Sequence, residues 1–139
     1  MSDMLGRSNV CLRVSRDCLN RVADDDSNLD IACFNAQQSL ESLLKYIIET
    51  NGMQAPKTHD IDELLVYARS SGFTYSDENR LMEMSYKISK WETTSRYGQG
   101  IKTTANSLEA VYSHIEKIRE EFAGTASSKF QQLRERLNQ

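Results

Sequence analysis

The sequence predicts an all-α protein, an antiparallel up-and-down bundle of about five helices followed by a short C-terminal helix. Proline occurs once, at Pro56, and glycine only six times in 139 residues, so few residues interrupt a helix. Apolar residues recur at steps of three and four along most of the chain, which is the spacing of one helix face. Because strand-like alternation of β-branched residues is missing, we expect no sheet.

The size and composition of the chain favour one globular domain, residues 1–139, with a single core. Its hydrophobic content is 39% and its formal charge is -3, so any contact with phosphate must come from a few local basic residues. No apolar run approaches the ~20 residues of a membrane helix, and the first residues do not resemble a signal peptide. We therefore expect a cytoplasmic protein without membrane contact. The three cysteines show no CxxC or Cys/His clustering, so we expect neither metal nor cofactor.

The first two helices are expected at about residues 9–23 and 29–50. Ser27 and Asp30 resemble a capping box at the start of the second helix, and Gly52 can take the left-handed conformation that ends a helix. This second helix should be the centre of the fold because it has the longest apolar stripe. The stripe contains Cys33, Ala36, Leu40, Leu43 and Ile47.

The remaining helices follow the connector that contains Pro56. Asp60 should cap a third helix that Gly72 closes, and Ser76 should open a fourth helix. Residues 93–104 have no apolar period and include two glycines, so they are expected to form a loop. A fifth helix is expected at 104–123, and Gly124 should separate it from a terminal helix or tail at 125–139.

A block in the middle of the chain carries a family resemblance. The segment IACFNAQQSLESLLKYII, with QAPKTHDIDELL after it and SRYG further on, is similar to the central part of bacterial and archaeal HEPN (higher eukaryotes and prokaryotes nucleotide-binding) domains. The resemblance is strongest over residues 29–118. It is carried by Ala32, Phe34, Ala36, Gln37, Gln38, Lys57, His59, Arg96 and Tyr97.

The resemblance implies a function and two partners. It implies a binding protein that recognises a nucleotide or an RNA phosphate through Arg96, assisted by Lys57. It also implies a homodimer that pairs with a small nucleotidyltransferase in a toxin–antitoxin-like system. Arg96, which is flanked by Tyr97, could stack on a base and bind phosphate with two parallel hydrogen bonds. The same arginine could instead be solvated or paired with an acid.

Many proteins of the resembling family are metal-independent ribonucleases in which four to six residues separate an arginine from a histidine. After Arg96 the corresponding positions hold Ile101, Lys102 and Thr103. A lysine at Lys102 is ordinarily fully protonated and is a poor general base. We therefore expect no catalytic residues, and we keep Lys102 only as a candidate ligand contact. The alternatives are a divergent ribonuclease that uses Arg96 with Lys102 or with a residue of a second subunit, and a structural dimer without a ligand.

Four further polar residues have two interpretations each. Lys57 and His59 could bind phosphate near the start of the third helix, or His59 could make only local capping hydrogen bonds. Gln37 and Gln38 lie among small apolar residues and are candidates for hydrogen bonds between helices or between subunits. His114 lies at the edge of the fifth helix's stripe, where packing is the expected role.

Overall fold

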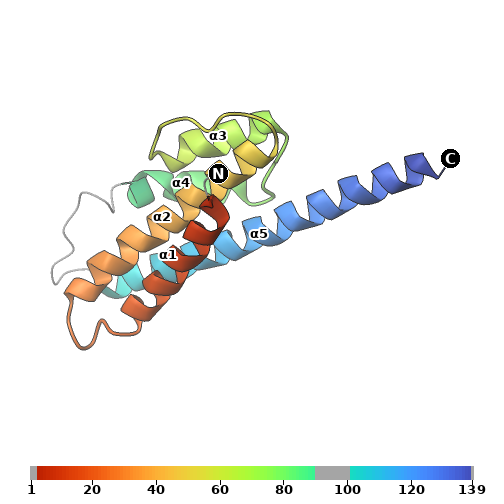
Figure 1. The fold of residues 1–139 in the computed structure, drawn as a ribbon. Helices are drawn as coiled ribbons and strands as arrows, with labels where there is room; N and C mark the ends of the chain where they lie inside the picture. Colours follow the sequence, from red (N-terminus) through yellow and green to blue (C-terminus); the bar gives the residue numbers. More distant parts are fainter. Residues whose placement is uncertain (1–2, 90–100, 139) are drawn as a thin grey trace.

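The computed structural model describes residues 3–89 and 101–138, with all side chains in these ranges except those of residues 89, 101–103 and 126–130. This part of the chain forms a bundle of helices in which α2 contacts each of the others (Figure 1). The described ranges contain no strand, so the predicted all-α fold is confirmed. The helices are α1 (Met4–Leu19), α2 (Ser27–Thr50), α3 (Ile61–Ser71), α4 (Glu78–Ser89) and α5 (Ile101–Leu137).

Helices α1 and α2 are antiparallel and are joined by buried serines. The hydroxyl of Ser8 donates to the carbonyl of Ser39, and the hydroxyl of Ser39 donates to the carbonyl of Ser8, both at 2.8 Å. Seven residues further along α1, the Ser15 hydroxyl donates to the carbonyl of Ala32 at 2.6 Å. Small side chains at these positions let the two backbones approach closely, and each buried hydroxyl has a partner.

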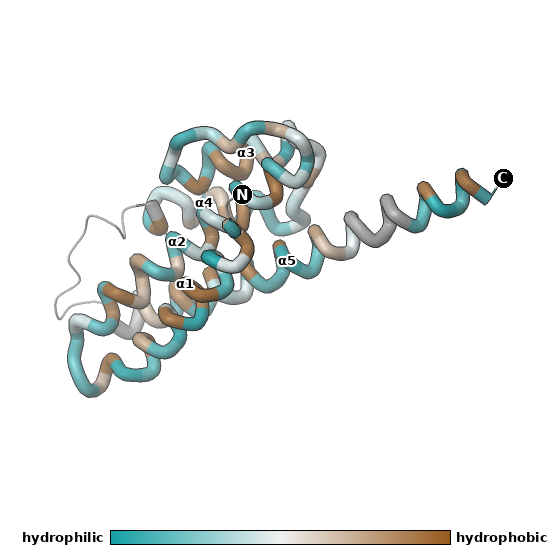
Figure 2. Tube along the Cα trace, in the orientation of Figure 1, coloured by the Kyte–Doolittle hydropathy of each residue, from teal (hydrophilic) through white to brown (hydrophobic). Residues whose placement is uncertain are grey.

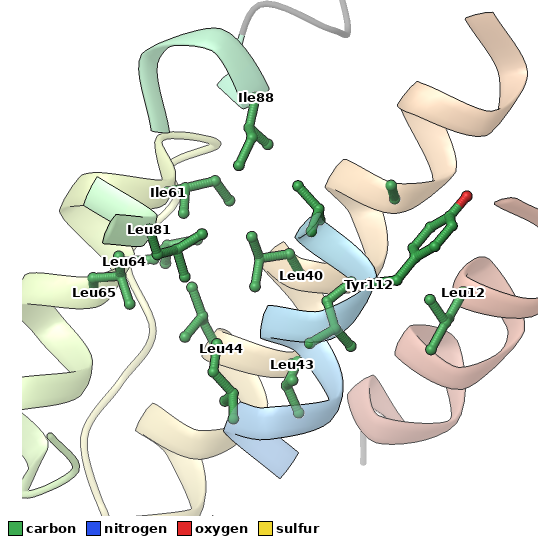
Figure 3. Packing of buried hydrophobic residues seen from close by; sticks show 14 of the residues in the cluster. Leu12, Leu40, Leu43, Leu44, Ile61, Leu64, Leu65, Leu81, Ile88 and Tyr112 are labelled. Atoms are coloured by element: carbon green, nitrogen blue, oxygen red, sulfur yellow. The ribbon is translucent and has the colours of Figure 1, made fainter. Parts of the chain in front are cut away.

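The core lies where α2 meets the other helices. Hydrophobic and hydrophilic residues alternate along each helix of the bundle (Figure 2), and the apolar ones gather in one cluster (Figure 3). Leu40 is fully buried at its centre, as its place in the predicted stripe requires. Cys33, Ala36, Leu43 and Ile47 are also buried, which confirms the predicted face of α2.

The connection from α2 to α3 sends the chain back along α2. At the end of α2, Gly52 adopts a φ of 91° and the amide of Met53 donates to the carbonyl of Ile48 at 3.1 Å, as in a Schellman motif. His59 then lies beside Glu41, and Asn51 donates to Ser71. Helix α3 therefore runs in the same direction as the second half of α2, which departs from a strict up-and-down order.

Some predicted helix starts were wrong in detail. Helix α1 begins at Met4, well before residue 9, because the carboxylate of Asp3 accepts from the Gly6 amide. The expected capping box does not form at α2, where the amide of Ser27 donates to Asp25 instead; this hydrogen bond lowers the pKa of Asp25. Asp60 occupies the predicted N-cap position of α3, but its side chain makes no capping hydrogen bond.

Helix α5 differs most from its prediction. It begins at Ile101, inside the loop expected at 93–104, because the buried Thr104 already packs on the same side as Leu108. It also continues through Gly124 to Leu137, so the expected break is absent and no separate terminal helix forms. The C-terminal part extends beyond the rest of the bundle (Figure 1), and the described side chains after residue 130 are exposed.

In residues 3–89 and 101–138, no helix combines the length and the apolar character needed to cross a membrane.

Candidate functional site

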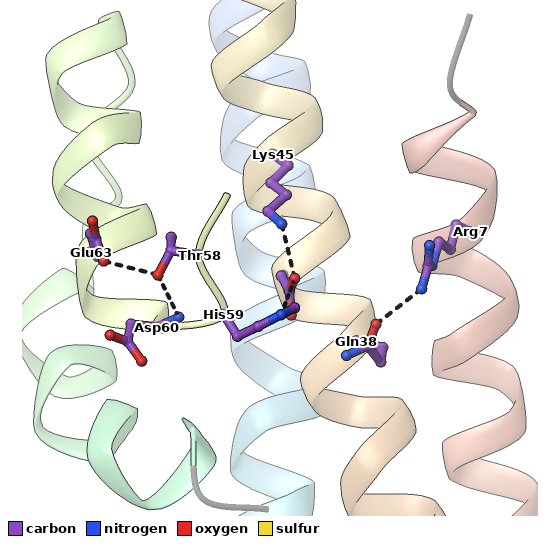
Figure 4. Close-up of polar contacts among 8 residues, drawn as sticks. Arg7, Gln38, Lys45, Thr58, His59, Asp60 and Glu63 are labelled. Atoms are coloured by element: carbon purple, nitrogen blue, oxygen red, sulfur yellow. Dashed lines mark hydrogen bonds and ion pairs between the residues drawn. The ribbon is translucent and has the colours of Figure 1, made fainter. Parts of the chain in front are cut away.

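The most unusual polar group of the bundle is the carboxylate of Glu41 on α2. Its side chain is only 7% exposed, and Glu41 is the one acidic residue among the buried residues of α2. One oxygen, Oε1, accepts from Lys45 Nζ at 3.0 Å and from His59 Nδ1 at 2.9 Å (Figure 4). The other oxygen, Oε2, is buried and has no hydrogen-bond partner. Burying a carboxylate without partners costs free energy. The contacts with Lys45 and His59 reduce this cost and thereby hold both side chains in place.

Lys45 and His59 reach Glu41 from different sides. Lys45 lies one turn further along α2, so the spacing of four residues brings its ammonium group over the carboxylate. His59 arrives from the connector that runs back along α2. The Lys45 side chain is 17% exposed and that of His59 is 65% exposed. The cluster therefore has a buried anionic centre and an exposed imidazole.

The connector next to His59 is held by Thr58. The Thr58 hydroxyl donates to Glu63 at 2.9 Å and accepts from the Asp60 amide at 3.2 Å (Figure 4). Lys57 precedes this contact and is exposed. The predicted pair of Lys57 and His59 thus lies on a short segment whose backbone is tied to the start of α3.

The start of α3 is a weaker anion site than its position suggested. Asp62 and Glu63 occupy its first turn, where carboxylates already balance the positive end of the helix dipole. Attraction for a phosphate at this end of the bundle must therefore come from the side chains of Lys45 and Lys57 rather than from the helix terminus.

Gln37 and Gln38 lie one turn before Glu41 and have different surroundings. The carbonyl oxygen of Gln38 accepts from Arg7 Nη2 on α1 at 3.1 Å, so this residue makes the expected hydrogen bond between helices. Gln37 is fully buried, and neither its amide nitrogen nor its amide oxygen has a hydrogen-bond partner. Together with Glu41 Oε2, its amide continues a buried polar strip along α2.

Three predicted ligand residues fall outside what the structure describes. Arg96 and Tyr97 lie in the range 90–100, and the side chain of Lys102 is not described although its backbone is part of α5. Their role as ligand contacts remains a prediction.

His114 belongs to a second polar cluster, at the contact of α4 and α5. It is 7% exposed, and its Nδ1 lies 2.6 Å from the hydroxyl of Tyr75. Burial lowers the pKa of His114, against the opposing effect of Asp77. Burial also raises the pKa of Tyr75. A neutral, hydrogen-bonded histidine between packed helices agrees with the predicted packing role.

A groove of about 560 Å³ adjoins this second cluster. Its lining carries both signs of charge, with Arg80 and Lys117 opposed by Asp77 and Glu83. Lys117 Nζ lies 3.6 Å and Arg80 Nε 3.7 Å from Asp77, so the cations of this groove are already paired. Lys45 of the Glu41 cluster is paired as well, so the preference for that cluster as an anion site rests on the exposed Lys57, two residues before His59.

In the part of the chain that the structure describes, no three His, Cys, Asp or Glu side chains come together as the ligands of a metal ion.

Two residues of the Glu41 cluster were missed in the sequence. Lys57 and His59 were candidates because they stand in a motif, whereas Glu41 and Lys45 looked like polar positions of an amphipathic helix. A spacing of four between an acid and a lysine usually marks an exposed ion pair. This pair becomes covered only because the connector between α2 and α3, which carries His59, packs against α2.

The comparison with family models agrees with this architecture. The model described as the HEPN domain matches residues 2–125. A search of curated proteins and a search of solved structures gave no match. The matched range covers α1 to α4, most of α5 and every residue of the Glu41 cluster. The chain therefore belongs to the HEPN domain family.

Proposed function

We propose that this protein is a binding module for a nucleotide or an RNA phosphate, and that its ligand contacts include Lys57 and His59. Membership of the HEPN family supports a function connected with nucleotides or RNA. The observation that carries the proposal is the Glu41 cluster, in which a buried carboxylate holds Lys45 and His59, while the exposed Lys57 lies two residues before His59 in the chain. Cations that are fixed in advance lose less side-chain entropy when an anion binds.

We add Arg96, Tyr97 and Lys102 to the proposed site on the basis of the sequence alone. An arginine can bind phosphate with two charge-assisted hydrogen bonds, and the neighbouring tyrosine offers a surface for a base. The motif that places a histidine after the arginine is missing here, so we propose binding without cleavage. The partner that the family resemblance implies is a small nucleotidyltransferase, with which the protein would form a toxin–antitoxin-like system.

The ribonuclease alternative has one observation in its favour. His59 Nδ1 contacts a buried carboxylate while the rest of the ring is exposed, which is how a general base is often oriented. A metal-independent ribonuclease could then use His59 with Arg96, Lys102 or a residue of a second subunit. The third reading, a structural dimer without a ligand, gives the exposed cations no role.

One titration separates these three functions. Labelled RNA and nucleoside triphosphates are titrated with the parent, Arg96→Ala and Lys57→Gln at two salt concentrations, and the RNA is recovered and sized. We expect binding that weakens at higher salt, that falls by about tenfold or more in Arg96→Ala because a charge-assisted contact contributes about 1.5 to 3 kcal/mol, and that leaves the RNA intact.

The other outcomes are equally informative. Arg96-dependent shortening of the RNA without added metal would establish the ribonuclease instead. Absence of binding to both probes would contradict the proposal and leave the structural dimer. Arg80→Gln is the matched control, because it removes an exposed cation at the α4–α5 groove and should leave the affinity unchanged.

A further inference from the structure

The contact between His59 and Glu41 determines more than the position of the imidazole. An ionised carboxylate can only accept hydrogen bonds, so the 2.9 Å contact with Glu41 Oε1 requires the hydrogen on His59 Nδ1. In the neutral imidazole the other nitrogen, Nε2, is then an acceptor. Lys45 Nζ donates to the same oxygen at 3.0 Å, so Glu41 Oε1 is an acceptor in this contact as well, which agrees with the assignment.

An exposed acceptor next to cations is an unusual combination for a site that binds only phosphate. A phosphate oxygen also accepts, so it cannot pair with Nε2 of the neutral ring. The cations Lys45 and Lys57 attract the anion. Nε2 of His59 can pair only with a hydrogen-bond donor, and this donor must lie close to the anion. The acidic side chains nearby, Asp60 and Glu63, lie on the α3 side of Thr58 (Figure 4), and Glu63 already accepts from Thr58.

A ribonucleotide carries this pair of groups. Its 2′-hydroxyl is a donor that stands next to the 3′-phosphate in RNA, and DNA lacks it. We infer that His59, oriented by Glu41, accepts a hydrogen bond from a ribose 2′-hydroxyl and makes the site selective for ribonucleotides. Glu41 acts as a positioning residue, because it selects the form of the imidazole that can accept. This inference rests on the proposed function, since it assumes that a phosphate binds at the same cations.

The test compares two oligonucleotides of one sequence, an RNA and its 2′-fluoro analogue. The analogue keeps the ribose shape and the phosphates but has no hydroxyl donor. Affinities are measured at about pH 8, above the range in which histidines ordinarily titrate. Since one hydrogen bond is expected to be gained, the parent should bind the RNA about three- to tenfold more tightly than the analogue.

Three variants show which residue provides the preference. His59→Ala should bring the two affinities together by weakening only the RNA complex. Glu41→Gln should do the same, because its amide can donate to Nδ1 and leave the hydrogen on Nε2. Lys57→Gln is the matched control on the same segment, and it should weaken both complexes equally. Thermal melting of each variant confirms that the bundle is intact.

Each remaining result counts against the inference in a recognisable way. Equal affinities of the parent for RNA and analogue would overturn the inference while leaving phosphate binding in place. An equal loss for both oligonucleotides in His59→Ala would overturn it too, because His59 would then act as a cation. Failure to bind either oligonucleotide would overturn the proposed function itself, and the selectivity with it.

Discussion

At the scale of single residues, the environment of Glu41 depends on the connector between α2 and α3, which packs against α2, and not on the sequence next to Glu41. The apolar positions around it predict correctly that Leu40 and Leu43 are buried. The same pattern assigns Glu41 and Lys45 to a polar edge, where acids and lysines are normally exposed. Burial of the carboxylate follows from the connector that brings His59 back beside it, and a contact across eighteen positions of the chain leaves no periodic signal.

His114 makes the stability of the protein depend on pH. Burial lowers its pKa from the ordinary value of 6.5, so the folded state binds a proton less readily than the unfolded chain. The stabilisation is therefore fully present above about pH 6.5 and is lost as the pH falls from there toward the lowered pKa. We expect the free energy of unfolding of the parent to fall more between about pH 7.5 and about pH 5.5 than that of His114→Gln.

Denaturant unfolding at the two pH values measures this difference. The two proteins share every other titratable group, so the contribution of these groups cancels in the comparison. Parallel loss of stability in parent and variant would contradict the role given to the burial of His114.

At the scale of secondary-structure elements, local signals predict helix ends only where they are strong. Gly72 ends α3 with a φ of 112°, as the sequence predicts, because a left-handed residue at this position is easiest for glycine. Gly124 was expected to break α5, and it does not. A single glycine costs only about 1 kcal/mol within a helix, which the flanking residues of α5 outweigh.

Ser15 joins three helices, which makes it the sharpest test of how they pack. Its hydroxyl donates to Ala32 on α2, and Tyr112 on α5 can therefore donate to it at 2.7 Å. Burial raises the pKa of Tyr112 to about 12, and the hydrogen bond with Ser15 opposes this shift. We expect Ser15→Ala to reduce the free energy of unfolding by about 1 to 3 kcal/mol, because it leaves the buried Tyr112 hydroxyl without this partner.

Chemical denaturation provides the measurement. Ser113→Ala, on the exposed side of α5, is the matched control and should change stability by less than about 0.5 kcal/mol. If Ser15→Ala is as mild as this control, the three helices do not meet at Ser15 as described.

At the scale of the whole molecule, the sequence predicts the class of fold better than its path. The apolar period and the central position of α2 follow from composition and spacing. The parallel course of α3 beside α2 does not, because Pro56 shows that a helix must stop but not where the chain goes next. The candidate site depends on that course, so only its connector residues, Lys57 and His59, could be predicted.

Helix α2 exposes two apolar side chains that a second copy of the chain could cover. Ile31 and Phe34 on α2 are 45% and 42% exposed, and their spacing of three places them on one side of the helix. We propose a homodimer that covers this side. Gln38, which is 8% exposed, remains a candidate for its interface, whereas Gln37 is fully buried within one chain and cannot reach a second subunit. Light scattering behind a sizing column should give twice the 15.9 kDa mass at tens of micromolar, where even a micromolar interface is mostly occupied.

A variant tests the surface as well as the mass. Phe34→Glu should give a monomer with unchanged helicity, because a charge cannot be buried there without a partner. A parent that elutes as a clean monomer, or a Phe34→Glu dimer, would contradict this arrangement.

The central claim is that phosphate binds at the Glu41 cluster, and amide chemical-shift mapping of the full chain tests it most directly. A nucleoside triphosphate is titrated into the isotope-labelled protein while the amide signals are followed. We predict the largest shifts at residues 57–60 and along α2 from Glu41 to Lys45, where the cations and the imidazole meet. Shifts confined to the α4–α5 groove around Arg80 and Lys117, with the residues of the cluster unmoved, would contradict the claim.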